Sequence, residues 1–418
     1  MLDNNRPLRI GFLTSEYVTE ENFSGGLAHY LHRVVKGLQD RGHEAEVFAL
    51  SDRGETISFR GIPVHRVRSS LKWAGECRWI NRCHWRVRKL FWKVFVSSHR
   101  ALWDAWALDK RFRARHRQKP FDLVQVPNYL SVGFFLTLRP PVPIVGRISS
   151  YRPLWNRHYG EEMDWDRRLM ERMELSTLKR CNALYAPSRL LADTLKRSEG
   201  IAVEVLAPPF YLEEDQADYS TYKERCRGFE YLLFFGSIGL LKGGGVLAEA
   251  LPRAMARCPD LHFVFAGKSI RAPNDGGDMM QTILERAGEF RNRVHYLGIL
   301  RHDRLYPVVE RARGVVLPSL VDNLPNTCLE AMAHGRVVIG TMGTSFEELI
   351  ENGRSGFLVS PGDPQAFSEA MVRLWTLSPG AREQMGALAK ERTYQLSPDY
   401  VMPRLEEFYK SIALRESP

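Results

Sequence analysis

Two carboxylates, Asp322 and Glu330, stand eight positions apart in the segment 318–341, which reads PSLVDNLPNTCLEAMAHGRVVIGT. The apolar run before Asp322 predicts a buried strand, the stretch 323–326 predicts a tight loop, and TCLEAMAHG predicts a helix that ends at Gly335. Asp322 is therefore expected at the carboxyl end of a strand and Glu330 in the first turn of the helix. Open α/β sheets bind ligands at that edge, where helix N–H groups also favour a phosphate. A nucleotide with a sugar attached would suit both features.

Glu330 also has a purely structural interpretation. Thr327-x-x-Glu330 matches the capping-box pattern, in which the glutamate side chain bonds back to the start of its own helix. From these residues alone, capping and ligand binding both stay open.

A second phosphate-related feature is FFGSIGLLKGGG, residues 234–245, a predicted strand followed by glycines and Lys242. Gly236 and Gly243 let the backbone come close to an oxyanion, and Lys242 places a point charge beside the start of the next helix. An ordinary turn is the alternative. The P-loop spacing is absent, and so is a dinucleotide G-x-G-x-x-G after the first strand, which disfavours kinase and oxidoreductase functions.

Near the N-terminus, Gly25 and Gly26 precede the predicted helix LAHYLHRVVKGLQDRGHE. Adjacent glycines after a strand give a loop that is able to pass close to a ligand. A simple loop and helix start would explain them equally well.

The acidic segment resembles the E-x7-E motif of the GT-B-fold, glycogen-synthase-like retaining glycosyltransferases, the glycosyl transferases group 1 family. PS precedes the first acid, and EAMAHG surrounds the second. The resemblance implies that Glu330 holds the nucleotide ribose and that Asp322 contacts the transferred sugar. It implies that the donor is bound by the residues between and before them, namely Gly236, Ser237, Gly243, Asn323, Leu324, Pro325, Asn326 and Thr327.

The two glycine elements fit the same resemblance. The first resembles the family's GR-x4-KG element, whose basic pair neutralises the departing diphosphate, and this implies that role for Lys242. The second resembles the family's GG loop followed by L-x-x-RGHEV, which implies that Gly25 and Gly26 lie at the cleft beside phosphate and acceptor.

The chain departs from the family pattern at three positions. The first acid is Asp322 in place of the usual glutamate, and the arginine of the basic pair is replaced by Ser237. A family histidine appears here as Ser149, close to Arg147, and both are expected on the acceptor side. Lys268 or Arg271 could supply the charge that Ser237 lacks.

Length and composition agree with a large two-domain enzyme. The 418 residues carry a prior of two to three domains, and 44% hydrophobic with 26% charged residues is ordinary for a globular protein. Six cysteines without a C-x-x-C pair suggest neither a disulfide framework nor a zinc site, so a reducing, cytoplasmic compartment is expected. The sequence shows no signal peptide and no run of about 18 apolar residues, so we expect a protein that is neither secreted nor membrane-spanning.

Short apolar runs alternate with amphipathic segments in a βαβα rhythm, which predicts parallel sheets covered by helices. With the resemblance, this gives the GT-B architecture: two Rossmann-like domains with parallel sheets facing across a cleft. The expected parts are an acceptor-binding domain at 1–208, a nucleotide-sugar-binding domain at 209–396, and a C-terminal helix at 397–418 that crosses back to the first domain.

The stretch 66–119 is strongly basic and aromatic. It holds sixteen Lys or Arg against three acids, and six of the nine tryptophans. A helical insertion at about 70–118 that associates peripherally with an anionic membrane would account for this composition, as would a solvated helical pair that turns its tryptophans inward. Nucleic-acid binding is disfavoured because no nucleic-acid fold motif is present.

Asp164-Trp165-Asp166 has the D-x-D spacing used by metal-dependent sugar transferases of another fold. Because it precedes a predicted helix and does not follow a strand, we interpret it as a helix cap and dipole partner. No catalytic metal and no cofactor are expected.

The sequence thus predicts a retaining glycosyltransferase of hexosyltransferase type, with Lys242, Asp322 and Glu330 at its centre. It would move a sugar from a nucleoside-diphosphate sugar to a glycan or lipid-linked acceptor in cell-surface polysaccharide or glycolipid biosynthesis. An epimerase-like GT-B enzyme, or a weakly active partner protein that binds membranes or glycans, are the alternatives.

Overall fold

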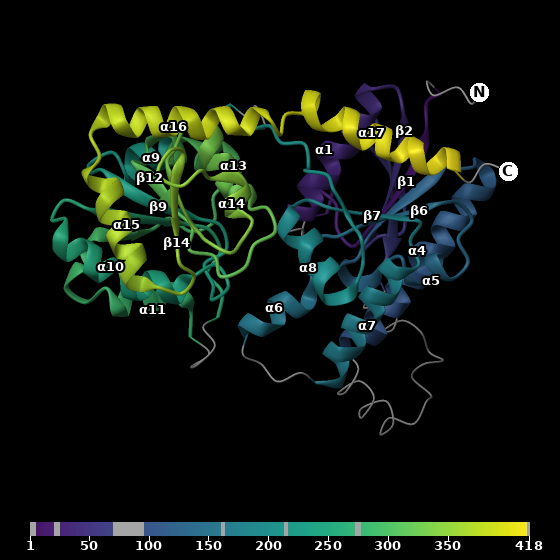
Figure 1. Cartoon of the computed structure of the whole chain (residues 1–418), viewed down its shortest axis with the longest axis horizontal. Coiled ribbons are helices and arrows are strands. Elements are labelled where there is room, and N and C mark those ends of the chain that lie inside the picture. The colour runs from purple at the N-terminus through teal and green to yellow at the C-terminus, as the bar shows by residue number, and fades with distance from the viewer. Residues whose placement is uncertain are drawn as a thin grey trace. The chain divides into compact units, whose positions relative to one another are not determined.

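The computed structural model describes residues 6–20, 26–69, 96–159, 164–212, 216–271 and 277–415 (Figure 1). The chain divides into two compact units. Unit 1 comprises Met1–Pro153, Gly160–Pro209 and Pro398–Pro418, and unit 2 comprises Leu154–Tyr159 and Phe210–Ser397. The short segment 154–159 clusters with unit 2, although the sequence assigns it to the first domain. Gly25 and residues 70–95 of the basic stretch lie outside the described residues.

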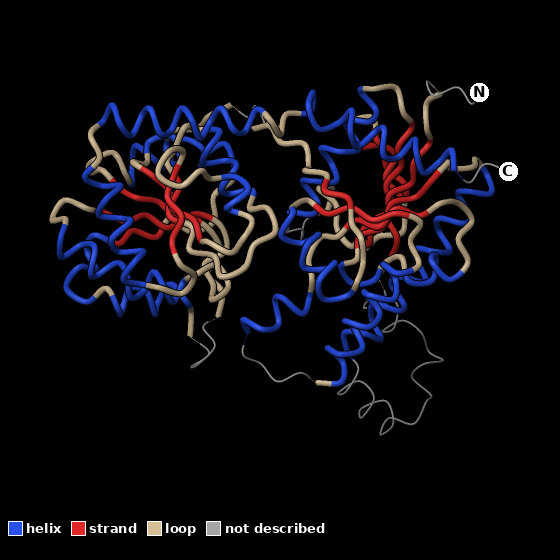
Figure 2. The backbone as a smooth tube through the Cα atoms, viewed as in Figure 1, coloured by secondary structure: helices blue, strands red, loops and turns tan. Residues whose placement is uncertain are grey.

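Within the described residues, unit 1 is built on an eight-stranded sheet in the order β3-β4-β2-β1-β5-β6-β7-β8. The strands are β1 Arg9–Thr14, β2 Glu44–Ser51, β3 Thr56–Phe59, β4 Ile62–Arg68, β5 Leu123–Pro127, β6 Ile144–Arg147, β7 Ala183–Ala186 and β8 Glu204–Val205. All neighbours pair in parallel except β3 with β4. The inner strands are apolar and buried, since helices cover both faces of the sheet (Figure 2).

The helices of unit 1 fall on two sides of this sheet. They are α1 Gly26–Asp40, α4 Val96–Gln118, α5 Phe134–Leu138, α7 Trp165–Lys179, α8 Arg189–Glu199 and α17 Pro398–Arg415, with a short 3₁₀ helix at Tyr129–Ser131. α1 contacts α17, whereas α4 contacts α5 and α7.

The last helix, α17, is part of the core of unit 1. Met402, Leu405 and Tyr409 are buried in the same hydrophobic cluster as β1 and α1. Gly37 of α1 allows the close approach, because a Cβ there would lie 2.9 Å from Met402 Sδ. The core of unit 1 is therefore completed by the last residues of the chain.

Glu46 near the start of β2 connects β1, β4 and α4 through hydrogen bonds. Its buried carboxylate accepts hydrogen bonds from Arg9 of β1, from Arg115 of α4 at 2.9 Å, and from His65 of β4 at 2.7 Å. Burial alone would raise the pKa of Glu46, but the bonds from His65, Arg115 and Arg9 outweigh it and hold the pKa far below its usual value. A carboxyl whose pKa is depressed on folding stabilises the fold at neutral pH, and this contribution is lost as the pH falls below about 4.5.

Glu46→Gln is therefore expected to lower the free energy of unfolding by about 2 kcal/mol at pH 7, because two guanidinium groups lose their buried counter-charge. Urea unfolding at pH 7 and at pH 4 measures this. The free energy of unfolding should fall less from pH 7 to pH 4 in the variant than in the parent. Glu44→Gln, at the exposed start of the same strand, should stay within about 0.5 kcal/mol. Equal effects of the two changes would contradict the buried role of Glu46.

Unit 2 is built, within the described residues, on a six-stranded parallel sheet in the order β11-β10-β9-β12-β13-β14. The strands are β9 Tyr231–Phe235, β10 His262–Ala266, β11 Val294–Tyr296, β12 Gly314–Val316, β13 Val338–Thr341 and β14 Gly356–Val359. The helices of unit 2 are α9 Ser220–Arg225, α10 Gly244–Arg257, α11 Met279–Arg286, α12 His302–Arg311, α13 Asn326–Ala333, α14 Phe346–Leu349, α15 Pro364–Thr376 and α16 Pro379–Tyr394, with a 3₁₀ helix at Gly288–Arg293. Helix α6 Arg152–Tyr159 begins in unit 1, and its residues 154–159 cluster with unit 2.

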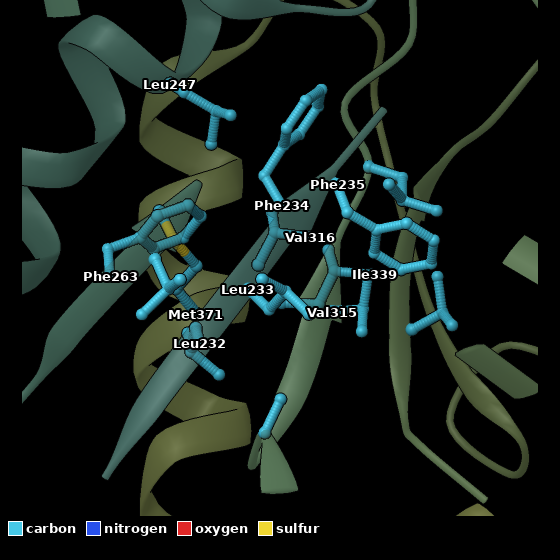
Figure 3. Close-up of a cluster of buried hydrophobic side chains, with 14 of the residues drawn as sticks. Leu232, Leu233, Phe234, Phe235, Leu247, Phe263, Val315, Val316, Ile339 and Met371 are labelled. Carbon is cyan, nitrogen blue, oxygen red and sulfur yellow. The ribbon is translucent and has the colours of Figure 1, made fainter. Parts of the chain in front are cut away.

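The core of unit 2 surrounds its central strands. Side chains of β9, β10, β12 and β13 meet Leu247 of α10 and Met371 of α15 (Figure 3). Because every residue of β9 is buried, this strand reads as a continuous apolar run, as expected for the centre of a parallel sheet.

The α/β class with two parallel-sheet domains is confirmed. The apolar runs predict strands at 8–16, 45–51, 62–68, 121–127, 143–149, 182–187, 231–237, 261–267, 293–298, 314–319, 336–341 and 356–361, and each of them is present. The sequence does not predict β3 and β8, the two edge strands of the unit 1 sheet, because they are only four and two residues long and carry no buried apolar run.

Candidate functional site

The candidate site lies at the carboxyl edge of the unit 2 sheet, where the strand order reverses. β9 has β10 on one side and β12 on the other, so the loops after β9 and β12 diverge to opposite faces of the sheet. Such a switch point is where open α/β sheets bind ligands. Leu320 N donates to Leu241 O at 2.8 Å, which ties the two loops together.

Lys242 and Asp322 form an ion pair at this edge. Lys242 Nζ lies 2.5 Å from Asp322 Oδ2, although the two residues are 80 positions apart in the chain. The Lys242 side chain is 33% exposed and that of Asp322 only 10%. Asp322 is held in turn by Ser345, whose hydroxyl donates to the Asp322 carbonyl at 3.0 Å. The ammonium group is thus fixed at the sheet edge while one side of it stays open to solvent.

The glycines around Lys242 are required by close backbone contacts. Gly243 has a φ of +81°, and a Cβ there would lie 2.1 Å from the carbonyl oxygen of Pro318. Gly236 has a φ of +115°, and a Cβ there would lie 3.3 Å from Thr327 Cγ2 in α13. The turn 236–243 therefore lies directly against the loop after β12 and the first turn of α13.

The helix α13 starts two residues earlier than a Thr327–Glu330 capping box requires. Its first residue is Asn326, and Pro325 occupies the N-cap position without a side-chain capping bond. Thr327 is the second helical residue, so it is not the N-cap that a Thr327–Glu330 capping box requires. Glu330 lies in the second turn, not the first as predicted, and is buried at 7% exposure.

The other predicted donor-binding residues line the same edge. Asn323 and Pro325 are buried beside Asp322, Leu324 and Asn326 are partly buried, and Ser237 is exposed after β9. Ile238 N donates to the carbonyl oxygen of Lys268 at 2.8 Å, so the loop that carries Lys268 runs beside Ser237. Lys268 and Arg271 are both exposed on that loop.

Cys328 lies in the first turn of α13 but is unsuited to act as a nucleophile. Burial, and then the negative charge of Asp322, raise the pKa of Cys328 well above its usual value. A thiol must be deprotonated to attack, so this side chain fills the core.

In unit 1 the structure brings Arg147 and Ser149 together at the end of β6. Arg147 Nη1 donates to Ser149 Oγ at 2.9 Å, and the guanidinium carbon lies 3.5 Å from the centroid of the Tyr30 ring. Within the described residues, Arg147 Nε has no hydrogen-bond partner although it is buried. Gly26 is the exposed first residue of α1.

Tyr30 is itself fixed by a buried polar network. Its hydroxyl bonds that of Tyr185, and the hydroxyls of Tyr185 and Tyr409 both donate to Gln125 Oε1. Burial raises the pKa of Tyr185 and Tyr409 well above the usual value, so both phenols stay neutral. Strand β5, strand β7 and helix α17 thereby hold the ring on which Arg147 rests.

Both aspartates of the D-x-D sequence cap helices. Asp164 is the N-cap of α7 and accepts from Arg167 N at 2.8 Å, as predicted. Asp166 caps a different helix, since it accepts from the backbone N–H groups of Ser97 and Ser98 at the start of α4.

Several basic residues in the described part of the basic stretch are paired with acids. Arg66 pairs with Glu20 and Glu55, Arg113 with Asp109, and Arg115 with Glu46. On α4, Trp106 is 37% exposed, and Lys110 Nζ lies 3.8 Å above its ring. None of the helices in the described ranges combines the length and apolar character needed to cross a bilayer.

Two family models match the chain, one described as Glycosyltransferase Family 4 over residues 24–214 and one described as Glycosyl transferases group 1 over residues 230–376. The chain thus carries a Glycosyltransferase Family 4 domain followed by a group 1 glycosyltransferase domain. It is a nucleotide-sugar-dependent glycosyltransferase of GT-B type, as the sequence predicted.

Individual relatives of this glycosyltransferase are distant. An uncharacterized glycosyltransferase of Methanocaldococcus jannaschii is 25% identical, over 93% of this chain and 94% of the relative. Among solved structures, sucrose-phosphate synthase from Thermosynechococcus elongatus has a TM-score of 0.76 at 18% identity and covers 98% of this chain and 100% of its own. Anabaena HepE in complex with UDP-glucose has a TM-score of 0.69 at 18% identity and covers 97% of this chain and 100% of its own.

Sequence reasoning missed two features of the glycosyltransferase. One is Ser345, whose bond to the Asp322 carbonyl depends on a loop after β13 that carries no motif. The other is a cavity of about 680 Å³ in unit 1, whose lining comes from β2, β4, α4 and the loops between elements, scattered between residues 15 and 132.

Proposed function

We propose that this glycosyltransferase moves a hexose-type sugar from a nucleoside-diphosphate donor to a hydroxyl of a glycan or lipid-linked acceptor, with retention at the anomeric carbon. The observation that carries the proposal is the Lys242–Asp322 ion pair, set at the switch point of the unit 2 sheet. Cell-surface polysaccharide or glycolipid synthesis would use such a reaction. Retention rests on the resemblance of the motifs alone.

Charge on the departing diphosphate is what the site must stabilise. As the bond from the anomeric carbon to the diphosphate oxygen breaks, the acceptor oxygen bonds to that carbon and its proton passes to the departing diphosphate. In this proposal Lys242 and the N–H groups at the starts of α10 and α13 stabilise the growing negative charge. Asp322 keeps the ammonium group in position and, with a donor bound, would accept hydrogen bonds from sugar hydroxyls.

The test is a donor-hydrolysis screen across nucleotide sugars, begun with UDP-hexoses because HepE, which shares the fold, is solved with UDP-glucose. We expect hydrolysis of at least one donor and the same rate in the presence of EDTA, because no metal is proposed. Hydrolysis that EDTA abolishes and manganese restores would overturn the metal-free mechanism. Failure to bind any nucleoside diphosphate in a thermal-shift panel would overturn the function itself.

Glu330→Gln is expected to weaken nucleoside-diphosphate binding about tenfold, because a charged acceptor for the ribose hydroxyls becomes a neutral amide. Isothermal titration with the best nucleotide from the screen measures this. Glu249→Gln, on the exposed side of α10, is the matched control and should bind as the parent does. If Glu330→Gln lowers the melting temperature but binds nucleotide normally, Glu330 has only a structural role.

Peripheral attachment to an anionic membrane through 66–119 remains part of the proposal, and its basis is the composition of that stretch. Flotation of the whole chain with anionic and with neutral vesicles tests it. Binding to anionic vesicles should fall as salt is raised. Equal recovery with both kinds of vesicle would contradict it.

A further inference from the structure

Asp322 places a negative charge directly beside the ammonium group that the proposed mechanism assigns to the diphosphate. Its Oδ2 lies 2.5 Å from Lys242 Nζ, and its Oδ1 accepts from Asn323 N at 3.1 Å. The Asp322 carbonyl is held by Ser345 Oγ at 3.0 Å. Because both carboxylate oxygens are bonded and the side chain is only 10% exposed, the charge is fixed next to the ammonium group.

The distance between these two charges limits how far a bound phosphate can lie from Asp322. A phosphate oxygen that accepts from an ammonium group lies about 2.8 Å from the nitrogen. Asp322 Oδ2 is 2.5 Å from the same nitrogen, so any phosphate oxygen bonded to Lys242 lies within about 5.3 Å of the carboxylate, whatever the pose of the ligand. Two negative charges at that separation repel each other strongly at a partly buried site.

The ion pair supplies little net positive charge to a ligand. In the described part of the chain, Lys242 and Asp322 form ion pairs only with each other. Backbone N–H groups at the starts of α10 and α13 are the remaining groups of this site that favour an anion. The site should therefore bind a diphosphate more weakly than an unpaired lysine at the same position would.

A nucleotide sugar and the nucleoside diphosphate that is left after transfer would meet this carboxylate differently. The nucleotide sugar is esterified at its outer phosphate, so it carries one negative charge fewer. Its sugar also brings hydroxyl groups, which can donate to a carboxylate that only accepts hydrogen bonds. The spent nucleoside diphosphate carries the additional charge and has no sugar hydroxyl to offer. Repulsion by Asp322 is therefore largest for the product.

We propose that Asp322 discriminates between the donor and the spent nucleoside diphosphate, and that its charge weakens the binding of the product. This inference rests on the proposed function, because it concerns the release of the product from the same site. The two acids of the motif then act in opposite directions on nucleotide affinity. Glu330 strengthens the binding of both ligands through the ribose, whereas Asp322 weakens the binding of the product.

Isothermal titration of the full chain with UDP and with UDP-glucose, in the presence of EDTA, tests this inference. If the donor screen selects another nucleotide, its diphosphate and its sugar derivative take their place. Asp322→Asn removes the charge but keeps the size of the side chain and a carbonyl oxygen for Lys242. UDP should bind this variant about tenfold more tightly than it binds the parent. The affinity for UDP-glucose should rise by less than about threefold, because weaker bonds to its hydroxyls offset the reduced repulsion.

Three further variants serve as controls. Asp322→Glu keeps the charge and should bind UDP within about threefold of the parent. Asp260→Asn, on the exposed loop before β10, removes the same charge at the opposite edge of the unit 2 sheet and should leave both affinities unchanged. Thermal unfolding shows whether each variant keeps the fold. If Asp322→Asn does not fold, Asp322→Ser, which also removes the charge, replaces it with the same expected shift.

Unchanged or weaker binding of UDP by the folded Asp322→Asn variant would overturn the inference. An equal gain for UDP and UDP-glucose would also overturn it, and so would the same gain in Asp260→Asn, since net charge alone would then explain the result. Binding to the parent separates this failure from that of the proposed function. If the parent binds UDP or another nucleoside diphosphate and the charge-removing variant gains nothing, the inference alone falls. If the parent binds no nucleoside diphosphate, the proposed function falls with it.

Discussion

Replacing Lys242 with alanine is expected to lower kcat by a factor of about 10²–10³, the usual loss when one preorganised group that stabilises transition-state charge is removed. Lys242 is held at the sheet edge by Asp322 at 2.5 Å and is the basic residue that remains of the family's pair, since Ser237 stands at the other position. The measurement is steady-state transfer or donor hydrolysis with the best nucleotide sugar. Because the side chain is one-third exposed, stability should change by less than about 1 kcal/mol.

Two further variants serve as controls for this result. Lys242→Arg keeps the charge with a different shape and should retain more activity than the alanine variant. Lys223→Ala, on the exposed surface of α9, should leave kcat unchanged. Unaltered kinetics in Lys242→Ala would remove this lysine from the site and shift attention to Lys268 and Arg271.

Gly243→Ala is expected to lower the free energy of unfolding by about 3–4 kcal/mol. Part of this comes from placing an L-residue at a φ of +81°, and the rest from a Cβ that would lie 2.1 Å from the Pro318 carbonyl oxygen. Urea unfolding measures the change. The contact joins the loops after β9 and β12, so nucleotide binding should weaken in parallel.

Gly245→Ala is the matched control two residues further on. Gly245 is in α10, has an ordinary φ, and a Cβ there would meet only Leu240 Cδ1 at 3.9 Å. Alanine at that position should stabilise the protein by about 0.5–1 kcal/mol, since glycine is the poorer helix former. Destabilisation of the same size at both positions would show that the Pro318 contact is unimportant.

Local patterns predicted most of the fold because the buried strands are apolar over nearly every residue, as β5 and β9 illustrate. They failed where strands are short and lie at an edge, as for β3 and β8. The start of α13 was misplaced because Thr327 resembles a cap, while Pro325, which has no side-chain acceptor, occupies that position.

Pairings between distant residues could not be predicted from local patterns. Motif resemblance placed Lys242 and Asp322 in one site, but their direct ion pair depends on loops 80 residues apart. The charge of the basic stretch is a similar case. Arg66 and Arg115 are neutralised by Glu20 and Glu46, which lie outside the stretch, so a count along the sequence overstates the charge available to a partner.

The place of α17 in the core of unit 1 has a consequence for synthesis of the protein on the ribosome. Met402, Leu405 and Tyr409 are made after the whole of Phe210–Ser397, so unit 1 lacks part of its interior while unit 2 is being translated. At about 5–20 residues per second this delay lasts on the order of 10–40 s. Unit 2 can therefore finish folding first, and nascent unit 1 exposes the apolar surface of α1 until translation ends.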